Sequence, residues 1–186
     1  MLLRNMTMML ALVPLMALAA TDTLRAECDA AGAAIDRLQA LTTAESAARD
    51  ALATIRRNAQ DWKNLLLRGG DPSQRQVMQS RFDAQAGTYQ MRLSQLRTQL
   101  TPLGLAVDRV DTLESERATL FERYRMALER HGVSSLEAAA AADRDVQGAD
   151  VATFRTLEQL IDVVAGQTEA QFGNLRAAIA ACTSNK

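Results

Sequence analysis

Apolar and polar positions alternate with a helical period along almost the whole chain after residue 27. Apolar or small residues recur at steps of three and four from Cys28 to Leu66, interrupted by Glu45, which predicts one long amphipathic helix. The same spacing predicts three more helices, over residues 72–100, about 106–131 and about 150–182. Because no strand-like alternation appears, we expect an all-α, up-down-up-down antiparallel four-helix bundle with long first and last helices.

Residues that end or begin helices separate these segments. Gly69 is expected to take the left-handed conformation that closes the first helix, and Asp71 with Pro72 to begin the second, where Gln74 completes a capping-box-like pattern. The stretch 134–150 is the least regular part of the chain. In it, Ser134 with Glu137 predicts a short alanine-rich turn of helix. The remaining predicted breaks are Thr101, Pro102, Gly104, Gly132, Gln147 and Gly148.

The N-terminal stretch has the pattern of a secretory signal peptide. A basic residue precedes the apolar run Met6–Ala20, and this run is shorter than the roughly 20 apolar residues that a membrane helix requires. Cleavage after Ala26 is favoured over cleavage after Ala19. It divides the chain into a leader of residues 1–26 and a single domain of residues 27–186, which we expect in the periplasm. An uncleaved N-terminal membrane anchor is the alternative.

The two cysteines test this topology. In an up-down-up-down bundle both chain ends lie at the same end, so Cys28 and Cys182 can lie level with each other on neighbouring helices. In an oxidising compartment this placement predicts a structural disulfide between them. Two unrelated buried thiols are the alternative, and the absence of a C-x-x-C motif disfavours a redox-active pair.

Composition excludes several classes of function. The chain has 186 residues with a formal net charge of -1 and only 4% aromatic residues, which gives no reason to expect nucleic-acid binding. A single His, His131, leaves no two-His metal site, and a haem held by Met78 and His131 is a remote alternative. We find no catalytic triad or phosphate-binding glycine loop. No metal, cofactor or enzymatic activity is therefore expected.

Two patches of the sequence resemble a known family. The run Q-x-W-K-N-x-L-L-R-G-x-D-P, from Gln60 to Pro72, and a weaker patch, from Asp143 to Asp150, are similar to segments in the periplasmic sensory regions of bacterial methyl-accepting chemotaxis proteins. The resemblance implies a sensory four-helix bundle, and such bundles are commonly dimeric. Since the sequence shows no second membrane helix and no signalling region before Lys186, we expect a stand-alone domain that would need a separate membrane receptor as partner.

The predicted topology brings both patches to the end of the bundle opposite the chain termini. We therefore predict a small-molecule site or docking surface there, in which charged and polar groups bind the ligand and Trp62 forms an apolar wall. Its candidate residues are Trp62, Lys63, Asn64, Arg68, Arg144 and Asp145. In the alternative interpretation Trp62 fills the core and Arg68 pairs with Asp145 or Asp150.

Two classes of function follow from these observations. The first is a non-catalytic ligand-binding or sensory-type bundle. The second is a periplasmic helical module that binds other proteins, as a chaperone or packing partner does. The sequence identifies no ligand.

Overall fold

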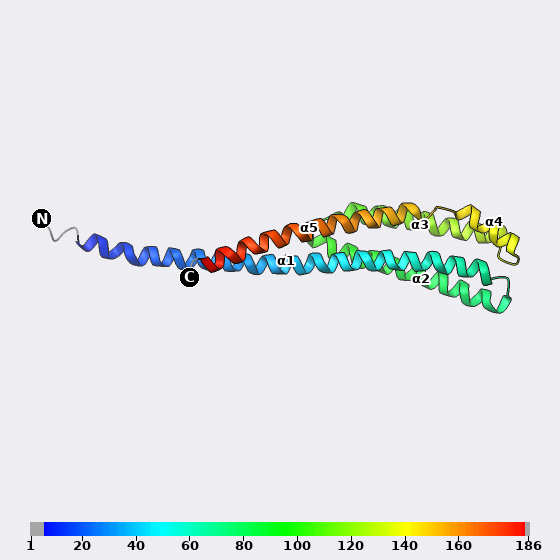
Figure 1. Ribbon diagram of the computed structural model, residues 1–186, viewed down its shortest axis with the longest axis horizontal. Coiled ribbons are helices and arrows are strands. Elements are labelled where there is room, and N and C mark those ends of the chain that lie inside the picture. Colours follow the sequence, from blue (N-terminus) through cyan, green and yellow to red (C-terminus); the bar gives the residue numbers. More distant parts are fainter. Residues whose placement is uncertain (1–5, 185–186) are drawn as a thin grey trace. The chain divides into compact units, whose positions relative to one another are not determined.

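The computed structural model describes the backbone of residues 6–184 and the side chains of residues 25–184, and every regular element in this part of the chain is helical. The expectation of an all-α protein is confirmed. The elements are α1 (Met6–Arg68), α2 (Pro72–Leu100), the 3-10 helix η1 (Thr101–Leu103), α3 (Val107–His131), α4 (Leu136–Val146) and α5 (Val151–Ser184) (Figure 1).

The first helix begins earlier than the sequence pattern predicts. Its α-helical backbone starts at Met6 and continues without a break to Arg68. The predicted signal peptide, with the anchor as its alternative, lies in a segment whose side chains are outside the described residues, apart from Arg25 and Ala26. Within residues 25–184, no helix combines the length and the apolar character that crossing a membrane requires.

The connection between α3 and α5 contains more helix than expected. The described chain has five α-helices instead of the four predicted, because α4 extends for 11 residues through the alanine-rich stretch. Its N-cap is Ser135, whose side chain accepts a hydrogen bond from the N–H of Ala138, so the prediction of Ser134 as the cap is wrong by one residue. Consecutive alanines have high helix propensity, which explains why the helix continues for three turns.

The turn between α1 and α2 is close to the prediction, except at Gly69. Asp71 is the N-cap of α2 and its side chain accepts from the N–H of Ser73 at 2.8 Å. Gly69 does not adopt a positive φ, so the predicted left-handed cap is wrong. Glycine is required here because other atoms lie close to the backbone. A Cβ at this position would lie 2.5 Å from both the Leu65 carbonyl oxygen and the Val133 Cγ2 atom.

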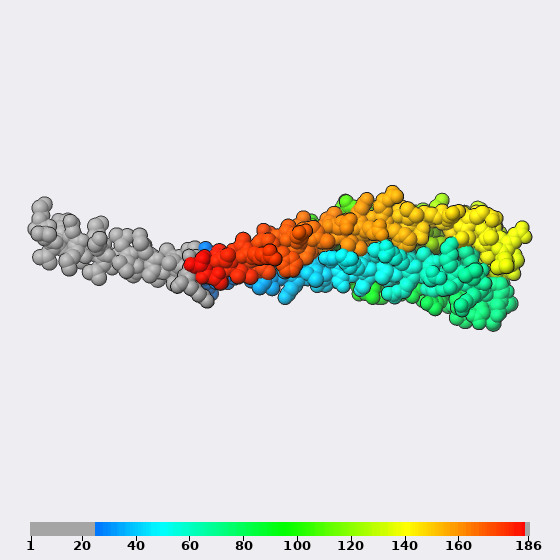
Figure 2. All heavy atoms as spheres, in the orientation of Figure 1, coloured from blue at the N-terminus to red at the C-terminus, as the bar shows by residue number. Residues whose placement is uncertain are grey.

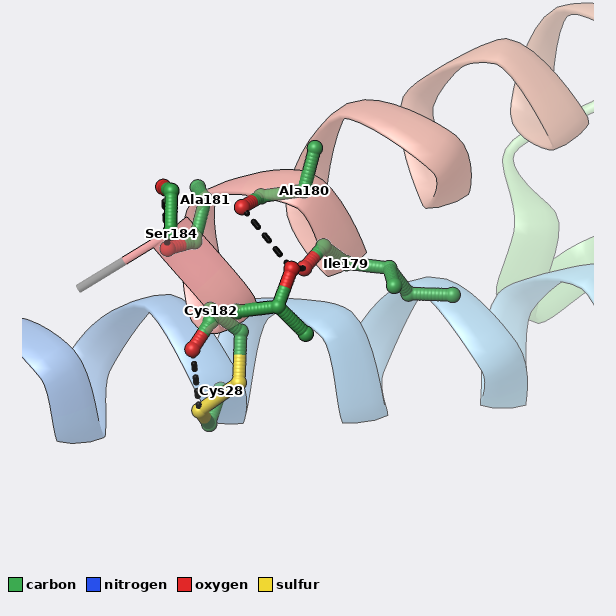
Figure 3. The surroundings of a disulfide bond; sticks show 7 residues. Cys28, Ile179, Ala180, Ala181, Cys182 and Ser184 are labelled. Carbon is green, nitrogen blue, oxygen red and sulfur yellow. Dashed lines mark hydrogen bonds between the residues drawn. A yellow bond between two sulfur atoms is a disulfide. The ribbon is translucent and has the colours of Figure 1, made fainter. Parts of the chain in front are cut away.

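The chain divides into two compact units, and each is described here by itself. The first comprises the residues up to Ala40 and those from Gly166 onward. In this unit a disulfide joins Cys28 to Cys182 with a Cα–Cα distance of 4.9 Å, as predicted (Figure 3). The buried amide of Gln171 donates a hydrogen bond to the Ala34 carbonyl oxygen at 3.2 Å, which gives a partner to a polar group on the apolar seam.

The second unit, from Leu41 to Ala165, contains the main apolar core. Side chains from all five helices contribute to it, and the largest fully buried ones in this unit are Trp62, Tyr89, Leu41, Ile55, Leu65, Leu93, Leu96, Leu100, Leu113, Leu120, Leu157 and Leu160. The close approach of Gly69 to Val133 places the α1–α2 turn beside the α3–α4 connection, so both lie at one end of this unit (Figure 1). We call this the turn end.

Removing the disulfide should lower stability strongly. The cysteines are 154 residues apart, so the chain-entropy model gives a loss of about 4 to 5 kcal/mol for Cys28→Ser, equivalent to roughly 10 to 20 degrees in melting temperature. Circular dichroism melts would measure this shift. Reduction of the parent protein should have a similar effect, and equal melting points for the oxidised and reduced protein would contradict the prediction.

Gly69→Ala should destabilise the protein by about 1 to 3 kcal/mol, since the new methyl group overlaps a backbone oxygen and a β-branched side chain. Gly70→Ala is the matched control: the nearest atoms to a Cβ there lie 3.8 and 3.9 Å away, which is ordinary contact. Chemical denaturation of both variants would compare their unfolding free energies. Equal losses of unfolding free energy in the two variants would show that the close approach does not restrict position 69 to glycine.

Candidate functional site

Trp62 lies in the core at the turn end. Only 1% of it is exposed, and its ring packs against Tyr124 at a centroid distance of 4.7 Å and against Phe82 at 5.9 Å. Phe82 in turn meets Tyr124 edge-on at 5.3 Å. Trp62 belongs to α1, Phe82 to α2 and Tyr124 to α3, so the cluster joins three helices. In this structure Trp62 therefore fills the core, as the alternative interpretation of the sequence expected.

The indole N–H of Trp62 contacts α4. Its indole N–H donates to Asp143 Oδ1 at 3.2 Å, and Lys63 Nζ donates to the two oxygens of the same carboxylate at 2.7 and 2.8 Å. Asp143 is on α4, so these bonds attach α4 to α1. The tie between the two sequence patches thus runs through Lys63 and Asp143. Arg68 pairs with neither Asp145 nor Asp150.

Asp145, also on α4, attaches this helix to the end of α3. Its Oδ2 atom accepts from Arg130 Nη1 at 2.8 Å and from His131 Nε2 at 2.9 Å, both at the end of α3. The hydrogen bond from His131 is the main reason why the pKa of the Asp145 carboxyl lies below its usual value, with Arg130 contributing further. Burial, reinforced by Asp150 and Asp143, raises the pKa of Tyr124. The single His is therefore hydrogen-bonded to a carboxylate of α4 at the end of α3.

The remaining predicted site residues do not gather around one point. Arg68 and Arg144 are exposed and Asn64 is half-buried. Of the six candidates, Trp62 and Lys63 meet at Asp143, while Asp145 bonds to α3 instead. The structure brings both sequence patches to the turn end, but it does not assemble the six residues into one pocket.

A mainly apolar hollow of about 290 Å³ lies beside the Lys63–Asp143 pair. In Figure 2 the surfaces of α1 (cyan) and α4 (yellow) meet in this region. Two large apolar side chains at its edge are unusually exposed, Leu67 at 72% and Leu136 at 78%. We call this the α1–α4 hollow, and its lining residues are Lys63, Leu66, Leu67, Leu136, Ala139, Ala140 and Asp143.

Of the residues that line the α1–α4 hollow, only Lys63 is among the site residues predicted from the sequence. Asp143 had a detectable signal, since it begins the second sequence patch. Leu67 and Leu136 are apolar residues off the helical seam, a pattern that also occurs at many surface positions without a function. No group of three or more His, Cys, Asp and Glu residues that could hold a metal ion occurs in the described part of the chain.

Comparison with known proteins relates the chain to a chemotaxis protein. No family model matches the chain. No solved structure matches it either. The chain is similar to the methyl-accepting chemotaxis protein CtpH of Pseudomonas aeruginosa, with 35% identity over 111 residues that cover 58% of this chain. The chain spans only 18% of the length of that relative. The similarity agrees with the resemblance in the sequence and supports a chemoreceptor-like relationship for this helical domain.

Proposed function

We propose that this chain is a non-catalytic sensory-type domain that binds a small molecule, related to the input region of a chemoreceptor. The observation that carries the proposal is the similarity to a methyl-accepting chemotaxis protein over 111 residues. On this proposal the ligand enters the α1–α4 hollow, where apolar walls exclude water and the Lys63–Asp143 pair supplies both signs of charge.

The proposal includes a four-helix bundle as the architecture of the second unit, with α4 as an added element. Four bonds between helices support it. Asn58 Nδ2 of α1 donates to the Phe82 carbonyl oxygen of α2, and Arg97 of α2 pairs with Asp111 of α3. The other two bonds are Thr156 of α5 to Glu116 of α3 and Arg56 of α1 to Glu158 of α5. Together these contacts connect α1, α2, α3 and α5 in a closed ring, as neighbours around a common core would be.

The proposed compartment is the periplasm. A disulfide between Cys28 and Cys182 persists in an oxidising environment and is rare in the cytosol, which supports export. Either a cleaved leader or an uncleaved N-terminal anchor is consistent with this location. We also propose that the domain forms a homodimer and that a separate membrane receptor binds its liganded form.

The second candidate function is a helical protein-interaction module. The exposed Leu67 and Leu136 favour it, because neighbouring large apolar side chains with more than two thirds of their surface exposed are typical of docking surfaces. In that case the α1–α4 hollow receives a side chain of a partner protein in place of a small ligand.

A thermal-shift screen of the disulfide-bonded protein against small organic acids, amino acids and amines would test the first function. A ligand at one hundred times its dissociation constant stabilises by about 2.7 kcal/mol, which raises the melting temperature by roughly 5 to 10 degrees. We expect Lys63→Gln to remove the shift while lowering the unliganded stability by less than about 1 kcal/mol, since the Lys63–Asp143 pair is largely exposed.

Arg57→Gln is the matched control, because Arg57 is an exposed cation on α1 that does not line the hollow. It should keep the full shift. A ligand whose effect survives Lys63→Gln binds elsewhere, which would contradict the proposed site. If no compound produces a shift but Leu136→Ser abolishes concentration-dependent association, the protein-interaction function is favoured.

A further inference from the structure

A second groove, which shares no lining residue with the α1–α4 hollow, contains polar atoms that the fold leaves without partners. It lies between α3 and the beginning of α5 and has a volume of about 320 Å³. Thr153 on α5 lines it and is 0% exposed, yet its Oγ1 atom has no hydrogen-bond partner. The Glu116 carboxylate on α3 is oriented by Thr156, whose hydroxyl donates to Oε1 at 3.0 Å, and its buried Oε2 atom also has no partner. We call this the α3–α5 groove.

Unsatisfied buried atoms of this kind are uncommon and require an explanation, because each loses its hydrogen bonds to water on folding. Glu116 Oε2 can only accept hydrogen bonds when the carboxylate is ionised, so its missing partner is a donor. Thr153 Oγ1 can both donate and accept. An ammonium group satisfies Glu116 both in charge and in hydrogen bonding.

The opposite end of the α3–α5 groove is positive. Arg123 lies seven residues after Glu116 on α3 and makes no ion pair within the described residues. The amides of Ala152 and Thr153, in the first turn of the 34-residue helix α5, make no backbone hydrogen bond. Free N–H groups at a helix N-terminus favour an anion. The groove thus presents a carboxylate at one end and a guanidinium with a helix N-terminus at the other.

The spacing of the two ends limits the ligand. Seven residues of α-helix separate Glu116 and Arg123 by about 10 Å along the axis. A charge-assisted hydrogen bond of about 2.8 Å at each end leaves roughly 4 to 5 Å between the charged groups of the ligand. Between the ends the lining is apolar or small, with Leu120, Ala149 and Ala152, which suits methylene groups.

We infer that the α3–α5 groove binds a small extended zwitterion, an ω-amino acid of three or four carbons, with its ammonium group at Glu116 and its carboxylate at Arg123. Thr153 supplies a hydroxyl between them. This site shares no residue with the α1–α4 hollow, so it stands or fails independently of the function proposed above.

Calorimetric titration of the disulfide-bonded protein with glycine, 3-aminopropanoate, 4-aminobutanoate and 8-aminooctanoate would test the inference. Saturable binding should be strongest for the three- and four-carbon compounds. Butanoate and butylamine, which each carry one charge, should bind at least roughly tenfold more weakly, the discrimination expected when a charged group is left unpaired. Absence of saturable binding at every length would overturn the inference and leave water as the occupant. Equal binding of butylamine and 4-aminobutanoate would overturn it as well.

Three variants locate the site. Glu116→Gln, which retains the acceptor for Thr156, and Arg123→Gln should each weaken binding at least roughly tenfold. Arg155→Gln is the matched control, an exposed cation on α5 outside the groove, and should bind as the parent does. Thr153→Val should weaken binding yet raise the melting temperature of the unliganded protein by a few degrees, since it removes an unsatisfied buried hydroxyl. Unchanged titrations for all three groove variants would place any binding elsewhere.

Discussion

The contact of Trp62 with Asp143 is the interaction on which the arrangement of the turn end depends. The indole ring packs against aromatic rings of α2 and α3, and its N–H bonds to the carboxylate on α4. One side chain of α1 thereby contacts three other helices. Lys63 pairs with the same carboxylate, and this ion pair is largely exposed. Together these bonds attach α4 to the end of α1 beside the α1–α4 hollow.

The second unit contains both very close packing and buried polar atoms without hydrogen-bond partners. At the turn end the fit is so tight that Gly69 leaves no room for a methyl group against Val133. Farther along α3 the fold leaves Glu116 Oε2 and Thr153 Oγ1 without partners. Stability alone would favour apolar replacements at such atoms, and natural proteins usually retain imperfect polar positions where a function requires them. Among the buried atoms without partners, these two belong to residues that line the α3–α5 groove.

The two candidate sites suit different ligands. The α1–α4 hollow is apolar and bordered by an ion pair that is already formed, so it accommodates an apolar or amphipathic group. The α3–α5 groove separates its charges and leaves both available, so it suits a ligand with two charges of its own. A domain related to a chemoreceptor can use either kind of site to couple ligand binding to the packing of its helices, provided that the ligand prefers one packing arrangement over another.

The sequence by itself determined the helical class, the boundaries of α2 and most of α3, the Asp71 cap, the ends of helices at Gly104, Gly132 and Gly148, and the Cys28–Cys182 pairing. These features follow from local signals, namely helical periodicity, caps, and cysteines at matching ends of the pattern. Only the tertiary structure decided that Asp143 accepts hydrogen bonds from Trp62 and Lys63, and that Gly69 serves close packing. Both outcomes depend on contacts between residues far apart in sequence, and such residues carry no local signal of their contact. Topology brings the six predicted site residues to one end of the second unit, whereas side-chain packing decides which partner each of them contacts.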